Sequence, residues 1–213
     1  MSQPRIPPRP SSDWDDEVRA ARSVLRPPAY ARSAPKPRES TGCQESAGGQ
    51  EQRKPAGKRP ESNILGIFSW HPELTKAFLT FNNHLFHSTL TDRARELVTV
   101  RVSWLRRGEY EWAQHVRMAR NVGMTQEEVD AISAGPDSPV WGPFDAALLR
   151  ATDQVVADRH INDKTWNEIA GQLNREQLMD LVFTIGAYDL LAMAFNNFGL
   201  QLDSGMSGFP PNA

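Results

Sequence analysis

The pattern of apolar and polar residues predicts a chain of helices. From residue 71 onward, apolar positions recur three and four residues apart, as on one face of an α-helix. Residues 96–104 alternate valine with other residues as a strand would, but the flanking charges and the Thr91-Asp92 start favour a helix. The predicted helices cover residues 71–86, 93–105, 106–120, 125–133, 143–159, 162–173 and 175–200. The fold class is therefore expected to be all-α.

Two of these helices indicate where the core lies. In 71–86, the residues Leu74, Phe78, Phe81 and Leu85 fall on one face, which we expect to be buried. The last helix, 175–200, is apolar nearly all round, which is typical of a central buried helix. This helix also has more apolar surface than a small bundle covers, so a homo-oligomer is expected.

The N-terminal third has a different pattern. Residues 1–62 hold ten of the sixteen prolines and a long polar run, a composition that buries little apolar surface. Within it, Trp14, Val18, Ala21 and Leu25 have helical spacing behind a Ser or Asp N-cap, which predicts a short helix at about 13–25 that docks on the main body or on a partner. We therefore divide the chain into an extension (1–62), with a flexible connection over 31–62, a helical domain (63–203) and a tail (204–213).

Composition and charge exclude several classes of function. Residues 1–62 carry 12 Lys and Arg against 8 Asp and Glu, and residues 63–213 carry 12 against 18, so neither part resembles a nucleic-acid-binding surface. No stretch approaches the roughly 20 apolar residues that span a bilayer, and no signal peptide is evident. A single cysteine, Cys43, allows no intrachain disulfide. We expect a cytoplasmic protein with no nucleic-acid or membrane partner.

The first candidate site lies in the segment 106–120, "RRGEYEWAQHVRMAR". On a helical wheel His115 falls inside the apolar face and Glu111 borders it one turn earlier, whereas Gln114 and Arg117 face away. A histidine in this place is either a buried structural residue satisfied by a glutamate or part of a catalytic site. This helix alone favours the structural interpretation.

The preceding helix strengthens the catalytic interpretation. Arg101 falls in the middle of its apolar stripe, and Glu96 lies at the edge. A buried guanidinium requires a partner, which is either an acid such as Glu96, Glu111 or Asp189, or the carboxylate of a substrate. The two interpretations are evenly balanced at this point.

The segment "RARELVTVRVSWLRRGEYEWAQHVRMARNVGMTQEEVDAI" resembles the core of the carboxymuconolactone decarboxylase family, which includes the alkylhydroperoxidase D-like proteins. The resemblance covers most of residues 63–203. The peroxidase branch of that family has a glutamate, eleven residues, a cysteine, two residues, a second cysteine, three residues and a histidine. In register, these positions are Glu96, Gly108, Glu111 and His115 here. The resemblance implies an alkylhydroperoxidase D-like helical bundle, with trimers, dimers of trimers or intertwined dimers among its members.

The departure from the pattern changes the expected chemistry. Thiol peroxidase activity requires a thiolate and a resolving thiol, and Gly108 and Glu111 supply neither. The chain therefore looks closer to the decarboxylase branch, which works without cysteines, metal or organic cofactor. The expected function is decarboxylation, lactone opening or isomerisation of a small carboxylic acid or lactone, as by a lyase. The alternative is a non-catalytic oligomer that binds a small acid or acts as a scaffold.

The predicted site has catalytic and substrate-binding members. His115 is the expected general acid, and Glu96 or Glu111 orients the imidazole and sets its protonation. The residues expected to bind substrate are Arg101, Trp112 and His84, of which His84 also has a structural explanation. The five histidines form no metal-binding motif, so no metal is expected. We predict that Glu96 and His115 line one pocket, on antiparallel helices joined near Gly108, with Arg101 or Glu111 close by.

Overall fold

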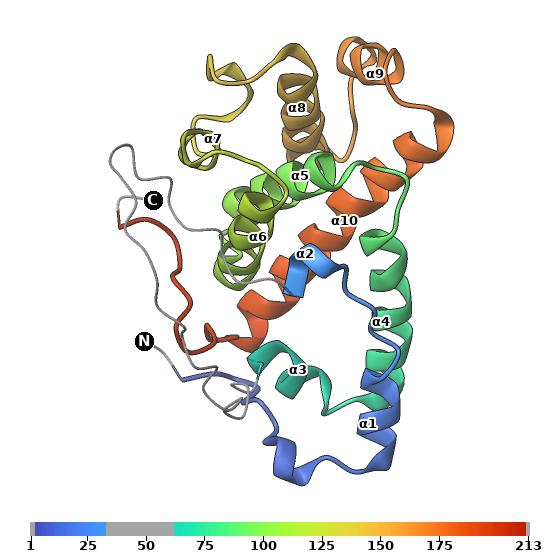
Figure 1. Ribbon diagram of the computed structural model, residues 1–213, viewed down its shortest axis with the longest axis vertical. Coiled ribbons are helices and arrows are strands. Elements are labelled where there is room, and N and C mark those ends of the chain that lie inside the picture. The colour runs from blue at the N-terminus through green and yellow to red at the C-terminus, as the bar shows by residue number, and fades with distance from the viewer. Residues whose placement is uncertain (1–2, 33–61, 212–213) are drawn as a thin grey trace, which may run out of the picture.

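The computed structural model describes residues 3–32 and 62–211, and this part of the chain is all-α with no strand (Figure 1). The elements, in chain order, are η1 (Ser11–Asp13), α1 (Asp16–Arg22), α2 (Ala29–Arg32), α3 (Asn63–Phe68), α4 (Pro72–Phe86), α5 (Asp92–Leu105), α6 (Glu109–Asn121), α7 (Gln126–Ala131), η2 (Gly135–Asp137), α8 (Pro143–Asp158), α9 (Asp163–Ala170) and α10 (Arg175–Phe198). The all-α prediction is confirmed, and segment 96–104 is helical. The helices α2 and α3 had no predicted counterpart.

The core is built around α5. This helix packs against α6, α8 and α10, and ten consecutive residues from Ala94 to Ser103 are buried. Thr91 starts the helix, because its side chain accepts a hydrogen bond from the backbone N–H of Ala94. Because α5 is buried on every side, each polar side chain along it needs a hydrogen-bond or charge partner inside the protein.

The helix α10 runs through the middle of the molecule beside α5 (Figure 1). Asn174 and Gln177 form a capping box at its start, and Gly199 ends it in the left-handed conformation at φ 69°. By length and composition α10 could cross a membrane, so the expectation that no stretch approaches that length was wrong. More than half of its apolar window is buried against the other helices, as in the core helix of a soluble domain.

The face that α4 buries overlaps only in part with the predicted one, since Leu85 is buried as predicted and Phe78 is partly buried against the core. Its buried residues are Thr75, Leu79, Asn82 and Leu85, whereas Leu74 is 53% exposed and Phe81 is 36% exposed. The physical reason is that α4 is covered from two sides, by α1 and by α10, and α1 lies along it at one edge of the molecule (Figure 1). Apolar periodicity alone does not identify a face when part of the cover comes from a distant segment.

The N-terminal segment packs on its own chain. The predicted helix at 13–25 is shorter and is interrupted, with Asp15 as the N-cap of α1 and Val18 and Ala21 buried against α4. The backbone N–H of Arg5 donates to the carbonyl of Phe198, and that of Arg9 to the carbonyl of Gly66. The predicted connection over 31–62, with Cys43, lies almost entirely outside the described residues.

Candidate active site

A tight turn brings α5 and α6 together. α5 ends at Leu105, Arg107 takes a left-handed conformation at φ 53°, and Gly108 is the N-cap of α6. A Cβ on Gly108 would lie 3.0 Å from a carboxyl oxygen of Glu111 and 3.1 Å from Cβ of Ala192 on α10. The turn thus folds α6 back on α5 and leaves little space at position 108.

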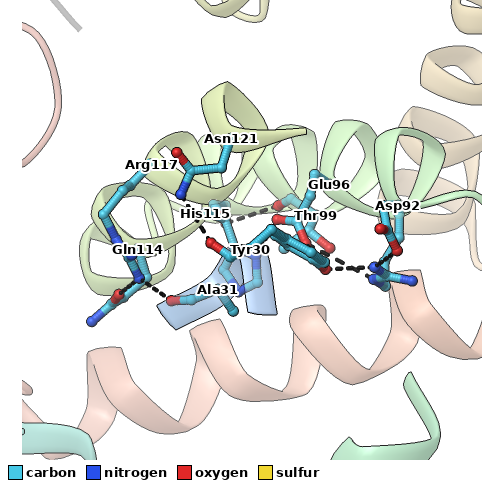
Figure 2. Close-up of polar contacts among 11 residues, drawn as sticks. Tyr30, Ala31, Asp92, Glu96, Thr99, Gln114, His115, Arg117 and Asn121 are labelled. Atoms are coloured by element: carbon cyan, nitrogen blue, oxygen red, sulfur yellow. Dashed lines mark hydrogen bonds and ion pairs between the residues drawn. The ribbon is translucent and has the colours of Figure 1, made fainter. Parts of the chain in front are cut away.

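The predicted pair of Glu96 and His115 is in direct contact. Nδ1 of His115 lies 2.8 Å from Oε2 of Glu96, and the two side chains are 8% and 1% exposed (Figure 2). With a carboxylate as the acceptor, Nδ1 carries the ring proton and Nε2 is the remaining acceptor nitrogen. The His115 ring also meets the Tyr188 ring edge-on, with 4.7 Å between the ring centroids.

A cavity of about 220 Å³ lies beside this pair. Its walls are mainly apolar and come from α3, α4, α6, α10 and the N-terminal segment, with Phe68, Phe78 and Phe86 among them. His115 and Glu111 line the cavity, whereas Glu96 lies behind the His115 ring and outside the lining. The sequence prediction that Glu96 and His115 line one pocket therefore holds for His115 alone.

Glu111 is a buried carboxyl without a hydrogen-bond partner. The residue is 3% exposed, and neither carboxyl oxygen has a partner among the described residues. Burial in apolar surroundings disfavours the charged form and raises the pKa of Glu111 to about 7. A carboxyl with this pKa exchanges protons readily near neutrality. The same burial raises the pKa of Tyr188 well above its ordinary value, and the charge of Glu96 raises it further.

Three residues predicted to bind substrate lie elsewhere. Arg101 does not line the cavity; it forms a bidentate ion pair with Asp153, at 2.7 and 2.8 Å, and a hydrogen bond to the carbonyl of Ile132. It is a structural link, because its donors are used by α8 and by the segment that follows α7. Its partner is none of the acids proposed from the sequence; Asp189 binds Arg106 and Arg159 instead.

Trp112 and His84 are also absent from the cavity wall. Trp112 is 4% exposed and packs against Trp104 and Phe209, with ring centroids 5.4 and 5.2 Å away. The side chain of His84 is 59% exposed and lies 2.7 Å from a carboxyl oxygen of Asp180. A helical wheel of one segment shows neither the C-terminal tail, whose Phe209 packs on Trp112, nor Asp180 of α10, which contacts His84.

The sequence interpretation missed three other residues near the site. Gln114 and Arg117, expected to face away, line the cavity, because the N-terminal segment covers this side of α6. Tyr30, in α2, donates from its hydroxyl to Oε1 of Glu96 at 2.9 Å (Figure 2). A tyrosine shortly after Pro27-Pro28, in a segment otherwise interpreted as a connection, was the only available signal.

Comparisons with known proteins agree with the helical fold. Residues 72–154 match the model of the carboxymuconolactone decarboxylase family. An uncharacterized protein of Bacillus subtilis, YdfG, is 21% identical over 141 residues, which are 64% of this chain and 96% of that protein.

Solved structures show the same fold. A protein of unknown function from Agrobacterium tumefaciens, titled a putative antioxidant defence protein AhpD, is 23% identical with a TM-score of 0.60, covering 68% of this chain and 98% of its own. The debrominase Bmp8, solved with 2,3,4-tribromopyrrole, is 12% identical with a TM-score of 0.67, covering 93% of this chain and 91% of its own. Residues 72–154 are therefore similar to the carboxymuconolactone decarboxylase family, and the described residues have an alkylhydroperoxidase D-like fold, with Gly108 and Glu111 at the positions of the paired cysteines of the peroxidase branch.

Proposed function

We propose that the protein is a cofactor-independent enzyme that moves protons on a small carboxylic acid or lactone bound beside Glu111 and His115. The observation that carries this proposal is the unpartnered carboxyl of Glu111 at the wall of a mainly apolar cavity. Burying a carboxyl without a partner lowers stability, and such a cost is typical of functional sites.

The two proton carriers have distinct surroundings. Glu111 has no hydrogen-bond partner among the described residues and a pKa of about 7, so both of its protonation states are populated at neutral pH. His115 is held at Nδ1 by Glu96, which leaves Nε2 for a bound molecule. Two groups on one helix and one cavity are sufficient to remove a proton from one atom and deliver a proton to another.

For a decarboxylation, the chemistry balances without a further reactant. The bond between the carboxylate carbon and its neighbour breaks, CO₂ leaves, and the electron pair passes into an adjacent carbonyl. The carbon that inherits the electrons then takes a proton from Glu111 or His115. The same two groups serve double-bond isomerisation, in which one accepts a proton and the other returns one. Arg117, which lines the cavity, takes the substrate-anchoring role first assigned to Arg101.

The proposal is tested with panels of lactones, β-keto acids and unsaturated acids in D₂O. Nuclear magnetic resonance follows CO₂ release, ring opening and deuterium incorporation at carbon in one experiment. We expect at least one class to react, and Glu111→Gln to slow that reaction on the order of 100-fold or more. The matched control is Glu127→Gln, which changes an exposed glutamate of α7 and should leave the rate unchanged.

The alternative is a protein that binds a small acid without converting it. Binding of a panel member, seen as a raised melting temperature, with no deuterium incorporation at any carbon would favour this alternative and contradict the enzymatic proposal.

A further inference from the structure

We infer that Tyr30, from the N-terminal segment, is a positioning residue of the site, which fixes Glu96 and through it the tautomer of His115. This inference rests on the proposed function for its meaning in catalysis, but its structural content is independent of any substrate. It makes the N-terminal segment part of the site.

A continuous series of hydrogen bonds joins Tyr30 to His115. The Tyr30 hydroxyl donates to Oε1 of Glu96, and Oε2 of Glu96 accepts from Nδ1 of His115, so each carboxyl oxygen has one donor (Figure 2). Arg95 donates to the same hydroxyl and to Asp92, at 2.6 Å in the second case. The chain of contacts therefore starts at the surface with Asp92 and ends at the cavity with His115.

The charged groups beside the Tyr30 hydroxyl are deeply buried. The side chains of Arg95 and Glu96 are each 1% exposed, so water cannot replace the tyrosine hydroxyl as a donor at low cost. The Nε atom of Arg95 lies 3.9 Å from Glu96, beyond hydrogen-bonding distance, and has no hydrogen-bond partner among the described residues. The hydroxyl of Tyr30 thus connects the buried guanidinium to the buried carboxylate.

Side chains of two helices hold the segment that carries Tyr30. Asn83 of α4 accepts from the backbone N–H of Arg26 at 2.7 Å and donates to the carbonyl of Val24 at 2.6 Å. From α6, Asn121 donates to the carbonyl of Tyr30 itself, at 2.9 Å. A segment held by main-chain hydrogen bonds on both sides places its tyrosine with little freedom.

The same N-terminal segment forms part of the cavity wall. Leu25, Pro27 and Ala31 line the cavity, and Arg117 of α6 donates to the carbonyl of Ala31 at 2.9 Å. The residues that close the cavity and the residue that holds Glu96 therefore belong to one segment. This segment lies outside residues 72–154, which match the family model.

The test compares Tyr30→Phe with the unchanged full-length protein by ¹⁵N nuclear magnetic resonance of the histidine rings. His115→Asn identifies the His115 signals among those of the five histidines. In the unchanged protein we expect the Nδ1–H tautomer, with a slowly exchanging ring proton. In Tyr30→Phe we expect that proton to exchange at least 10-fold faster and the two tautomers to mix, because Glu96 has lost one of its two fixed contacts.

The matched control is Tyr110→Phe. This change removes another tyrosine hydroxyl beside the cavity, whose partners are Asp203, Ser62 and Gln114 and not Glu96. The tautomer of His115 should be unaffected. A second variant, Asn121→Leu, removes the hydrogen bond to the main chain of Tyr30 and should shift the tautomer in the same direction as Tyr30→Phe, but less.

The outcomes separate this inference from the proposed function. A His115 tautomer and ring-proton exchange rate unchanged in folded Tyr30→Phe would overturn the role of Tyr30, even if a substrate is turned over. A shifted tautomer with no reactive panel member would support the role of Tyr30 and leave the proposed function contradicted. Once a substrate is available, Tyr30→Phe should lower kcat about 10-fold with little change in KM, whereas a purely structural residue would change the folded fraction alone.

Discussion

Two buried ionic clusters lie five residues apart on α5 and have opposite characters. The three guanidinium nitrogens of Arg101 donate to Asp153 and to the Ile132 carbonyl, and Arg101 does not line the cavity beside His115. Glu96 holds His115, which together with the unpartnered Glu111 faces a cavity. The difference teaches that a buried charge marks a site only where its neighbourhood leaves a polar group without a partner. A buried charge whose partners are complete links elements of the fold.

The largest expected effect comes from removing the group at the cavity. His115→Ala should lower turnover of any substrate found on the order of 100- to 10,000-fold, because it removes a proton carrier. Circular dichroism and the melting temperature check that the fold is kept. Substantial remaining turnover would remove His115 from the mechanism and leave Glu111 as the sole proton carrier.

Replacing Arg101 tests whether its cluster, with the complete ion pair to Asp153, serves the fold and not the site. Arg101→Met should lower the free energy of unfolding by about 2–3 kcal/mol, below the full cost of breaking a buried pair, since the Asp153 side chain is 29% exposed. Urea denaturation measures this change. The turnover per folded molecule should stay the same, and the double variant Arg101→Met with Asp153→Leu should recover part of the lost stability. A loss of turnover without a loss of stability would return Arg101 to the site.

Replacing Glu111 with glutamine should raise the stability of the fold while it lowers the activity. Its carboxyl has a pKa of 4.5 when unperturbed and about 7 in the fold, so the folded state binds the proton more tightly. The stability contributed by this group is complete below pH 4.5 and is lost as the pH rises to about 7. Glu111→Gln should therefore match the unchanged protein near pH 4 and exceed it by about 3 kcal/mol above pH 7.

Denaturation curves at several pH values check this difference. Glu127→Gln, on the surface of α7, should show no such pH-dependent gain. A constant difference between Glu111→Gln and the unchanged protein across this range would mean that Glu111 is already paired in solution.

The outer face of α10 carries apolar residues that the other described residues leave largely uncovered. Met179, Phe183, Leu190 and Met193 share one helical face and are between 49% and 62% exposed, although α10 is otherwise the core helix. We expect this face to form the interface of a homo-oligomer. The double variant Phe183→Glu with Met193→Glu should then be a monomer, as measured by light scattering. Gln126→Glu, on α7, is the control. A monomeric unchanged protein at micromolar concentration would refute this expectation.

The smallest expected effect concerns Cys43, which lies outside the described residues. Gly108 and Glu111 replace the cysteines of the peroxidase branch, so hydroperoxide reduction coupled to a dithiol should be absent. Cys43→Ser should leave turnover and stability unchanged. Peroxide turnover that is lost in this variant would contradict the interpretation of the missing cysteines.

The sequence by itself determined the long helices and the identity of the central pair. Local signals such as the Thr91 cap, the capping box at Asn174 and the repeat of apolar positions are written in neighbouring residues, so α5, α6, α8 and α10 could be predicted. The register of Glu96 and His115, 19 residues apart on two helices joined by a short turn, was sufficient to predict that the pair would meet.

Only the tertiary structure decided which buried polar groups belong to the site. Arg101 and Glu111 each fall on or beside an apolar face in the sequence, but Asp153 reaches the first, and no described residue reaches the second. Tyr30 contacts Glu96 across 66 positions of the chain, through a segment whose prolines predicted no such placement. Hydrogen bonding is satisfied by whatever group is near in space, and local sequence carries no record of partners that arrive from distant segments.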